Sequence, residues 1–294
     1  MSQSDARHVT GEAPLAIACG GGAFPAAVAD AVQRRGRGVF LFALRGFADE
    51  ASIQQYPHEW VHLGAIGHFL QLIKSKGCRD LVFVGTVHRP RLRDIRLDWP
   101  TIRWLPAYIR IARQGDNHLL SNIAQLGDHL GLRVRGIQDV APELLVPPGV
   151  LGRSQPSSVE EMEIKLGRSA LQALGPFDVG QEAVVVGGRV VAIEAAEGTA
   201  AMLERVAEVR RNGRVRAAAR AGVLVKATKL GQERRLDLPA IGVDTVKQAA
   251  AAGLAGIAVE AGGTIAADVN ALVRAADEAG LFLLGFEPDA GAGR

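Results

Sequence analysis

The sequence predicts an α/β protein of two domains: an N-terminal Rossmann-like domain with a parallel sheet covered by helices, and a C-terminal α/β domain with a mixed sheet. Short apolar runs alternate with amphipathic segments along most of the chain, which is typical of βαβ units. Aromatic residues make up only 5% of the sequence, which favours the Ala, Val, Leu and Ile cores of helix-covered parallel sheets.

The domain boundary is expected near the middle of the chain. With 294 residues, the chain is long enough to form two ordinary cores. Prolines and glycines recur without periodicity in Pro142–Ser158, as they do in linkers. We therefore expect a first domain at 14–144, a linker at 145–157 and a second domain at 158–290.

Composition and charge exclude several classes of protein. An apolar content of 48% excludes a disordered chain, and a net charge of +3 is too small to indicate nucleic-acid binding. No apolar segment is long enough to span a bilayer, and Met1–Ala13 lacks the apolar region of a signal peptide. Cys19 and Cys78 lack the C-x-x-C spacing of a zinc site and suit free thiols. We expect a soluble, cytoplasmic protein that binds no nucleic acid.

The first domain opens with a strand at Leu15–Cys19, three glycines at Gly20–Gly22 and a helix at 24–35, with Pro25 in its first turn. Backbone N–H groups in such a turn can approach a phosphate closely. The spacing is not G-x-G-x-x-G, and the next strand ends in Arg45 rather than an acidic residue, which weakens the case for a nicotinamide site. The glycines either contact a ligand or only allow a tight turn.

The rest of the first domain continues the alternation of strands and helices. Arg89 follows a strand that ends at Val84, where it can hold a phosphate or a sugar, or be a surface residue. Asp116 precedes a predicted helix and can cap it. Strands are also expected at 39–44, 60–63, 80–84 and 132–137, and helices at 66–76, 108–113 and 117–130.

The second domain is expected to begin with a helix at 158–174, capped by Ser157 or Ser158. Two apolar runs joined by Gly187-Gly188 predict a β-hairpin. Thr199 can cap the next helix, whose exposed N–H groups can take an anion. The remaining expected elements are helices at 200–211, 244–252 and 268–278, and strands at 223–225, 256–259 and 281–286.

The loop that follows the strand at 223–225 concentrates charge. Lys226 and Lys229 lie at the carboxyl end of this strand, where open α/β sheets bind their ligands. The whole loop carries four cations and two carboxylates, which suits a multiply charged anion handled beside a metal or a general base. The alternative is a solvated polar loop. Motifs of serine hydrolases, zincins and P-loop enzymes do not occur, so cleavage of a phosphate ester or anhydride is favoured.

Several segments in a fixed order carry a resemblance to a known family. They are Gly20-Gly21-Gly22, Asp178-Val179-Gly180-Gln181, Glu194-Ala-Ala-Glu197-Gly198-Thr199, Asp237-Leu238-Pro239 with Ile241-Gly242, and Ala252–Ile257. The chain in this respect resembles the UDP-2,3-diacylglucosamine pyrophosphatases of the LpxI type, from about Leu15 to Glu287. The resemblance implies a two-domain enzyme of lipid A biosynthesis that binds its substrate between the domains. It also implies water attack at the α-phosphorus, giving UMP and 2,3-diacylglucosamine 1-phosphate, with Mg²⁺ or Mn²⁺ as cofactor.

The resemblance assigns roles to particular residues. Asp237 corresponds to the critical aspartate, which binds the metal or orients water, and Glu197 is the second metal candidate. Lys226 and Lys229 are expected to act on the phosphates. The candidates for substrate binding are Gly21, Gly22, Arg89, Asp116, Gly180, Gln181, Gly198, Thr199, Met202 and Gln232. The expected partners are UDP-2,3-diacylglucosamine and the inner membrane surface, with which a cytoplasmic or peripheral protein would make transient contact. The sequence does not decide whether the protein forms a homodimer.

Two positions depart from the family pattern in a way that bears on function. Ala200 stands where the family reads aspartate after E-G-T, and Asn117 stands where G-D-D is commoner. If either aspartate binds metal in relatives, this chain binds metal more weakly. A sensor that binds a nucleotide sugar or lipid precursor without cleaving it is therefore one alternative. A nicotinamide-dependent oxidoreductase that uses the triple-glycine turn is the other.

Overall fold

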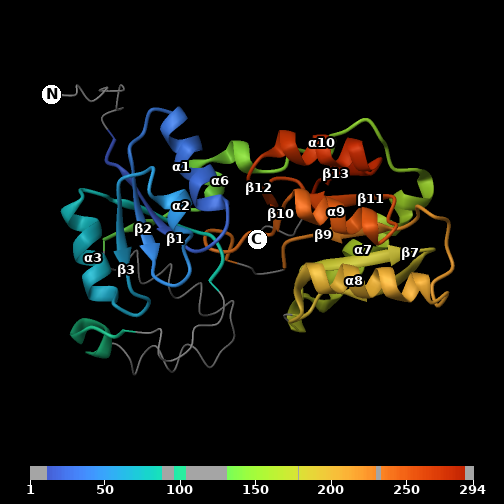
Figure 1. The fold of residues 1–294 in the computed structure, drawn as a ribbon, viewed down its shortest axis with the longest axis horizontal. Coiled ribbons are helices and arrows are strands. Elements are labelled where there is room, and N and C mark those ends of the chain that lie inside the picture. Colours follow the sequence, from blue (N-terminus) through green and yellow to red (C-terminus); the bar gives the residue numbers. More distant parts are fainter. Residues whose placement is uncertain (1–11, 88–95, 104–130, 178, 230–232, 289–294) are drawn as a thin grey trace. The chain divides into compact units, whose positions relative to one another are not determined.

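The computed structural model describes residues 12–87, 96–103, 131–177, 179–229 and 233–288 (Figure 1). The chain divides into two compact units, one of Met1–Glu143 with Glu233–Asp237 and one of Leu144–Gln232 with Leu238–Arg294. Among the helices of the described ranges, none has the length and apolar character needed to cross a membrane. Cys19 and Cys78 are both buried free thiols, as expected.

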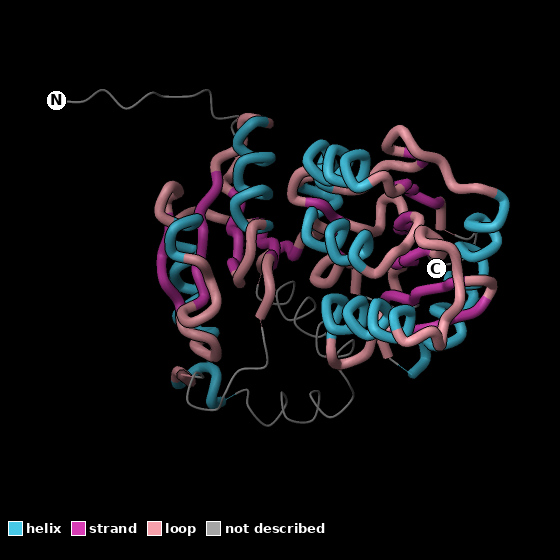
Figure 2. The backbone as a smooth tube through the Cα atoms, turned by 45° about the vertical axis from the view of Figure 1, so that its right-hand side comes forward, coloured by secondary structure: helices cyan, strands magenta, loops and turns pink. Residues whose placement is uncertain are grey.

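The described part of the first unit is built on a five-stranded parallel sheet. Its strands are β1 (Leu15–Cys19), β2 (Val39–Leu44), β3 (His58–Val61), β4 (Asp80–Val84) and β5 (Arg133–Val134), and its helices are α1 (Phe24–Arg34), α2 (Glu50–Ile53), α3 (Ile66–Ser75) and α6 (Ile137–Val140). The strand order is β3-β2-β1-β4-β5. The central β1 is apolar and buried throughout, as a strand covered on both faces must be. Helices α1 and α3 cover opposite faces (Figures 1 and 2).

Hydrophobic periodicity explains how these helices pack. The apolar side chains of α1 recur at helical spacing, so that Val28 and Val32 are both buried. On the face covered by α3, Ile73 belongs to a core cluster with Ala18 and Phe42. Each large side chain buried in this way contributes about 1.5–3 kcal/mol of transfer free energy. The small residues Ala16 and Ala18 of β1 both belong to this cluster.

The first unit differs from expectation at two strands. The strand predicted at 132–137 ends at Val134, because the Gly136 N–H donates to the Asp139 carboxylate (3.0 Å) and α6 begins there. The strand predicted at 60–63 is β3, which starts at His58 because that residue pairs with Leu41 of β2. The helices predicted at 108–113 and 117–130 lie outside the described residues.

The second unit contains a six-stranded mixed sheet in the order β6-β13-β11-β9-β7-β8. These strands are β6 (Gly149–Val150), β7 (Glu182–Val186), β8 (Arg189–Ile193), β9 (Val223–Lys226), β11 (Gly256–Glu260) and β13 (Phe282–Phe286). A separate parallel pair is formed by β10 (Ala240–Ile241) and β12 (Ile265–Ala266). The helices are α7 (Ser158–Leu174), α8 (Gly198–Arg211), α9 (Val243–Ala251) and α10 (Val269–Ala279). The 3₁₀ helices η2 (Pro142–Leu144) and η3 (Gly175–Phe177) lie in connections. The central strands β9, β11 and β13 are parallel, whereas β6, β7 and β8 pair antiparallel with their neighbours. The predicted α/β class with a parallel and a mixed sheet is thus confirmed.

Alternation along the central strands determines which helix each side chain meets. In β9, Val223 and Val225 belong to the core cluster that includes Ile164 of α7. Leu224, between them, belongs to the other cluster, which includes Leu203 of α8. Successive side chains of a strand point to opposite faces of the sheet. Helices cover both faces at β9, so all three residues of Val223–Val225 have to be apolar.

Two local predictions in the second unit can be followed residue by residue. The hairpin β7–β8 turns at Gly187 and Gly188, whose φ values of 60° and 70° are those a two-residue hairpin turn needs, so this prediction is confirmed. Helix α7 starts at a capping box in which the Ser157 N–H donates to the Glu160 carboxylate (2.6 Å). Within the stretch predicted as a linker, β6 pairs with β13 and joins the second sheet.

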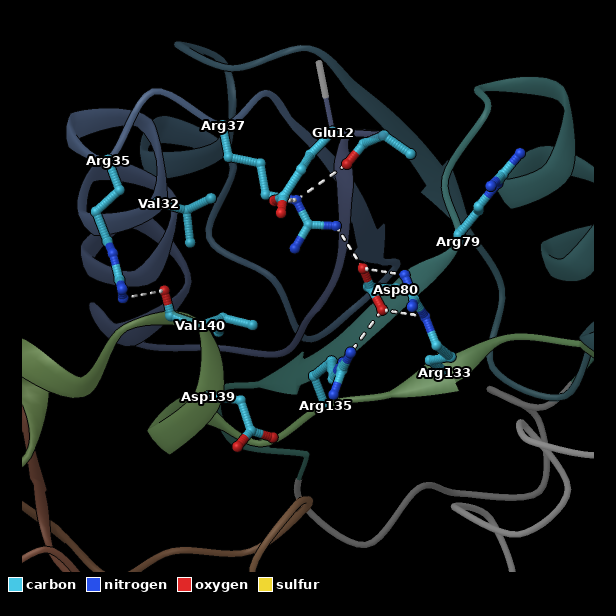
Figure 3. Close-up of a pocket in the computed structure, with 11 residues that line it drawn as sticks. Glu12, Val32, Arg35, Arg37, Arg79, Asp80, Arg133, Arg135, Asp139 and Val140 are labelled. Atoms are coloured by element: carbon cyan, nitrogen blue, oxygen red, sulfur yellow. Dashed lines mark hydrogen bonds and ion pairs between the residues drawn. The ribbon is translucent and has the colours of Figure 1, made fainter. Parts of the chain in front are cut away.

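A buried carboxylate fixes the amino-terminal edge of the first sheet (Figure 3). Asp80, the first residue of β4, accepts from Arg37 (2.6 Å), Arg133 (2.8 Å) and Arg135 (3.2 Å). Burial by itself would raise the pKa of Asp80, but the hydrogen bonds and charges of the arginines outweigh burial and hold the pKa below its ordinary value. We call Asp80 with these three arginines the Asp80 cluster.

The Asp80 cluster predicts a loss of stability in acid. A carboxyl group with a depressed pKa in the folded state stabilises that state above its unfolded pKa, and this contribution is lost as the pH falls. In urea unfolding, Asp80→Asn is expected to be less stable than the wild type at neutral pH, and the difference should shrink between about pH 5 and about pH 3. Asp244→Asn, which changes a side chain that is 89% exposed, is the control. A difference for Asp80→Asn that is independent of pH would contradict this account.

Candidate functional site in the second unit

The predicted residue Lys226 lies in a buried polar cluster at one edge of the second sheet. It is the last residue of β9 and faces Glu182, the first residue of the antiparallel neighbour β7. The Lys226 ammonium donates to Glu182 Oε1 (2.5 Å) and to the Ala240 carbonyl (2.6 Å). The Lys226 side chain is only 9% exposed and that of Glu182 is completely buried. Lys226 thus ties the end of β9 to β7 and to the start of β10.

Thr199 and Glu194 complete this group, which we call the Glu182 cluster (Glu182, Glu194, Thr199 and Lys226). The Thr199 hydroxyl, in the first turn of α8, lies 3.0 Å from Glu182 Oε1 and 3.1 Å from Glu194 Oε1. Its single proton can be donated to only one of the two carboxylates at a time. The Gln181 N–H donates to Glu194 Oε2 (3.3 Å). Three segments distant in sequence therefore meet at this edge.

The electrostatics of the Glu182 cluster favour a bound proton or cation. Burial raises the pKa of Glu182, the Lys226 charge lowers it and the Glu194 charge raises it again, and the net shift is upward. Glu182 Oε2 is buried and has no hydrogen-bond partner within the described structure. Two carboxylates face one ammonium, so the cluster as drawn carries an excess negative charge. Sequence reasoning missed Glu182; a charged residue at the start of an apolar strand was the available signal.

Glu260 fixes the beginning of the loop after β9. It is the last residue of β11, is buried, and lies at the same edge of the sheet because β9 and β11 are parallel. Its carboxylate accepts from the Thr228 N–H (3.0 Å) and hydroxyl (2.6 Å). The loop that carries Lys229 therefore starts from a fixed position, with Lys226 and Thr228 both held by buried carboxylates.

The predicted catalytic residue Asp237 follows further along the chain, in a turn of Glu233–Asp237, which belongs to the first unit. Its backbone N–H donates to the Glu233 carbonyl (3.0 Å), and its side chain is half-buried. The Glu233 carboxylate is bound by the Arg235 guanidinium through Nε and Nη2 (both 2.9 Å). These hydrogen bonds from Arg235 lower the pKa of Glu233. Because Glu233 and Arg235 neutralise each other, the turn holds fewer uncompensated charges than the sequence suggested.

The glycine-rich turn after β1 contacts a neighbouring loop of the first unit. The Gly21 N–H donates to the Thr86 carbonyl (2.9 Å), and the Thr86 N–H donates to the Gly21 carbonyl (3.0 Å). A Cβ on Gly20 would lie 2.6 Å from the Thr86 carbonyl oxygen. The glycines thus allow two backbones to approach, and the Gly21 N–H is occupied. Gly22, with φ of 91°, has a conformation that favours glycine.

This close approach predicts a large effect of one methyl group. Gly20→Ala is expected to destabilise the protein by about 1–3 kcal/mol, because the new Cβ meets backbone that must shift. Urea unfolding measures the change. Gly242→Ala is the control, since a Cβ there would meet no atom within 4 Å and its φ is −143°. Equal stability of the two variants would show that the turn accommodates a Cβ at position 20 without a steric conflict.

The remaining predicted residues occupy different environments. Glu197 is exposed and pairs with Arg205 (2.7 Å), which a metal would have to displace. Met202 is completely buried in the core of the second unit, which favours a role in packing. Gly180 approaches the Glu194 carbonyl so closely that a Cβ would lie 2.0 Å from the oxygen, and Gly198 starts α8 with φ of 79°. Arg89, Asp116 and Gln232 lie outside the described residues.

The carboxylates of the second unit are of the ligand type that the implied Mg²⁺ takes. Mg²⁺ is usually held by one or two carboxylates together with substrate phosphates. Within the described residues, no three His, Cys, Asp or Glu side chains are grouped for a metal. In the second unit, the Glu182 carboxylate, whose Oε2 has no hydrogen-bond partner in the described structure, and the Glu194 carboxylate are hard oxygen donors of the required kind. The donors present fit a cation bound jointly with a phosphate, and not a closed protein cage.

The fold and this site define a class of protein. It is a two-part α/β protein whose second part gathers lysines, carboxylates and a helix N-terminus at the edge where open α/β sheets bind ligands. Two family models match the chain, the LpxI N-terminal domain over residues 14–144 and the LpxI C-terminal domain over residues 147–284. The chain therefore belongs to the LpxI family.

A relative from Caulobacter vibrioides supports this membership along the whole chain. It is named UDP-2,3-diacylglucosamine pyrophosphatase LpxI. The two proteins are 40% identical over 274 residues, which is 93% of this chain and 98% of the relative. The match therefore extends over both units of the chain.

Proposed function

We propose that this protein hydrolyses UDP-2,3-diacylglucosamine to UMP and 2,3-diacylglucosamine 1-phosphate in lipid A biosynthesis. The observation that carries the proposal is the 40% identity to a relative named for this activity, over 98% of that relative. Lys229, which follows the anchored Thr228, supports it, because a diphosphate needs cations to neutralise it while water attacks. The reaction consumes one water and breaks the phosphoric anhydride bond.

The residues of the loop after β9 take distinct roles in this proposal. Lys229 follows the anchored Thr228 and is the candidate cation for the diphosphate. Lys226 positions the loop, since its ammonium is bound to Glu182 and to Ala240. Asp237 binds Mg²⁺ or orients the attacking water. Mg²⁺, when bound, would withdraw charge from the phosphate oxygens and lower the pKa of a bound water. Mn²⁺ can fill the same role with similar oxygen ligands.

Hydrolysis is tested by the release of UMP. Purified protein with Mg²⁺ and UDP-2,3-diacylglucosamine is expected to form UMP, and chelation of the metal is expected to stop it. If the substrate binds at saturating Mg²⁺ or Mn²⁺ but no UMP forms, the sensor alternative replaces the hydrolase. Tight NADH binding without UMP release would favour the oxidoreductase. Attack at the α-phosphorus, which the resemblance implies, places ¹⁸O from labelled water in UMP; attack at the β-phosphorus places it in the sugar phosphate.

We further propose that the protein works at the inner membrane surface, because its substrate carries two acyl chains. The basic residues at and after the end of α8 are Arg210, Arg211, Arg214, Arg216 and Arg220, and they could attract anionic lipid. Arg210 donates to the Ala218 (2.7 Å) and Ala221 (2.8 Å) carbonyls, and Arg220 donates to the Gly280 carbonyl (3.0 Å). These two arginines thus stabilise the fold and support membrane contact less than their charge suggests. Co-sedimentation with vesicles of anionic phospholipid tests the proposal, and analytical ultracentrifugation tests the homodimer.

A further inference from the structure

The first unit holds a cavity that the proposed hydrolysis does not use (Figure 3). Its volume is about 700 Å³, within the usual range of small-molecule sites. It lies at the amino-terminal edge of the sheet, where β4 starts with Asp80 and β5 starts with Arg133. The turn of Gly20–Gly22 follows the carboxyl end of β1 and belongs to the opposite edge. The cavity is therefore separate from the strand ends that normally bind ligands in this class of fold.

The lining of the cavity is strongly charged. Five arginines and three carboxylates line it, and none of the lining residues is a histidine. A fourth carboxylate, that of Glu143, lies outside the lining and 3.7 Å from Arg35, so the cations remain in excess. Of the carboxylates, Asp80 is shared by three guanidiniums, and Asp139 accepts from the Gly136 N–H. Glu12 is 70% exposed and lies 3.7 Å from Arg37. Asp80 thus orients three guanidiniums with a single negative charge.

The Asp80 cluster presents guanidinium donors that Asp80 cannot use. Each guanidinium has five N–H groups, whereas a carboxylate offers about four lone pairs to all three arginines. Arg133 and Arg135 are 63% and 41% exposed, so part of each guanidinium is accessible. They lie two residues apart along an extended segment and project to the same side, with Val134 buried between them. Figure 3 shows both guanidiniums converging with Arg37 on Asp80, whereas Arg79 points away.

We propose that this cavity binds the dianion of a phosphate monoester, held by Arg133 and Arg135. The planar forks of arginine match the oxygens of phosphate, and Asp80 fixes their orientation before the ligand arrives. The excess of arginines over carboxylates suits the dianion that a monoester forms above its second pKa, which is about 6. Val32 and Val140 in the lining offer apolar contact to a small organic group. The site is independent of the hydrolytic reaction.

Isothermal titration with phenyl phosphate tests the proposal on the full chain. The wild type is expected to bind it, and Arg133→Ala/Arg135→Ala is expected to bind at least tenfold more weakly, roughly the loss of one charge-assisted hydrogen bond. Arg133→Lys/Arg135→Lys keeps the charge but loses the forks, so its affinity should lie between the two. Arg189→Ala/Arg211→Ala removes the same charge from exposed sites elsewhere and should bind as the wild type does.

Further measurements separate this site from the hydrolytic site and identify the source of the phosphate. Asp237→Ala should bind phenyl phosphate unchanged even if it abolishes hydrolysis. Binding should strengthen between about pH 5 and about pH 7 for phenyl phosphate but not for sulfate, which stays dianionic. Binding to vesicles containing phosphatidic acid, in place of phenyl phosphate, would identify a lipid headgroup as the source. Equal binding by the wild type and a folded Arg133→Ala/Arg135→Ala, or no binding to either probe, would overturn the proposal.

Discussion

Asp237→Ala is expected to lower kcat for UDP-2,3-diacylglucosamine by about 10³-fold, because the carboxylate that orients water or metal is lost from the transition state. The fold should survive, since the Asp237 side chain is half-buried and lies in a turn that is closed by backbone hydrogen bonds. Substrate binding, measured by titration, should change little. Loss of kcat without loss of binding is the signature of an interaction made in the transition state.

A second aspartate near the same loop serves as the control for Asp237. Asp244, in the first turn of α9, is 89% exposed and pairs only loosely with Lys247 (3.6 Å). Asp244→Ala removes the same charge and is expected to retain kcat within about twofold, since a change at an exposed ion pair is worth little. If Asp237→Ala kept wild-type kcat, Asp237 would have no catalytic role, and the metal and water assignments would both fail.

Lys226→Met is expected to destabilise the second unit by about 3–5 kcal/mol, because it leaves the carboxylate of Glu182 buried without its cation. Since burial already raises the pKa of Glu182, the loss should grow as the pH rises above the ordinary glutamate value. Urea unfolding at two pH values measures both effects. Both effects arise because the buried Glu182 carboxylate must either take up a proton or remain charged without a partner in Lys226→Met.

A double variant distinguishes the buried charge from simple loss of packing. Glu182→Met/Lys226→Met removes both charges and keeps similar volume, so it is expected to recover most of the stability that Lys226→Met loses. A double variant as unstable as the single one would mean that Lys226 acts mainly through the Ala240 carbonyl. The activity of a well-folded double variant then reports whether the Lys226 charge itself is needed by the substrate.

The sequence predicted correctly those elements that depend on interactions between residues close together in the chain. The buried run of β1, the Gly187-Gly188 turn and the Ser157–Glu160 cap each depend on neighbours within a few positions in the sequence. Such interactions are readable because the spacing alone brings the groups together. Strand β3 was misplaced by two residues, since its bounds depend on pairing with β2 rather than on its own sequence.

The polar clusters could not be predicted from spacing. Glu182 meets Lys226 because β7 pairs antiparallel with β9, a register that nothing in the local sequence encodes. In the same way, Asp80 meets Arg133 and Arg135 because β5 lies beside β4. Buried charge pairs of this kind are set by topology.

The central claim is that this chain breaks the anhydride bond of UDP-2,3-diacylglucosamine, and ³¹P NMR of one reaction mixture tests it most directly. With protein and Mg²⁺, the two diphosphate resonances of the substrate are expected to decay while two phosphomonoester resonances, of UMP and of 2,3-diacylglucosamine 1-phosphate, grow in equal amounts. A substrate spectrum that stays unchanged, with protein that is folded, binds the substrate and is saturated with metal, would contradict the account.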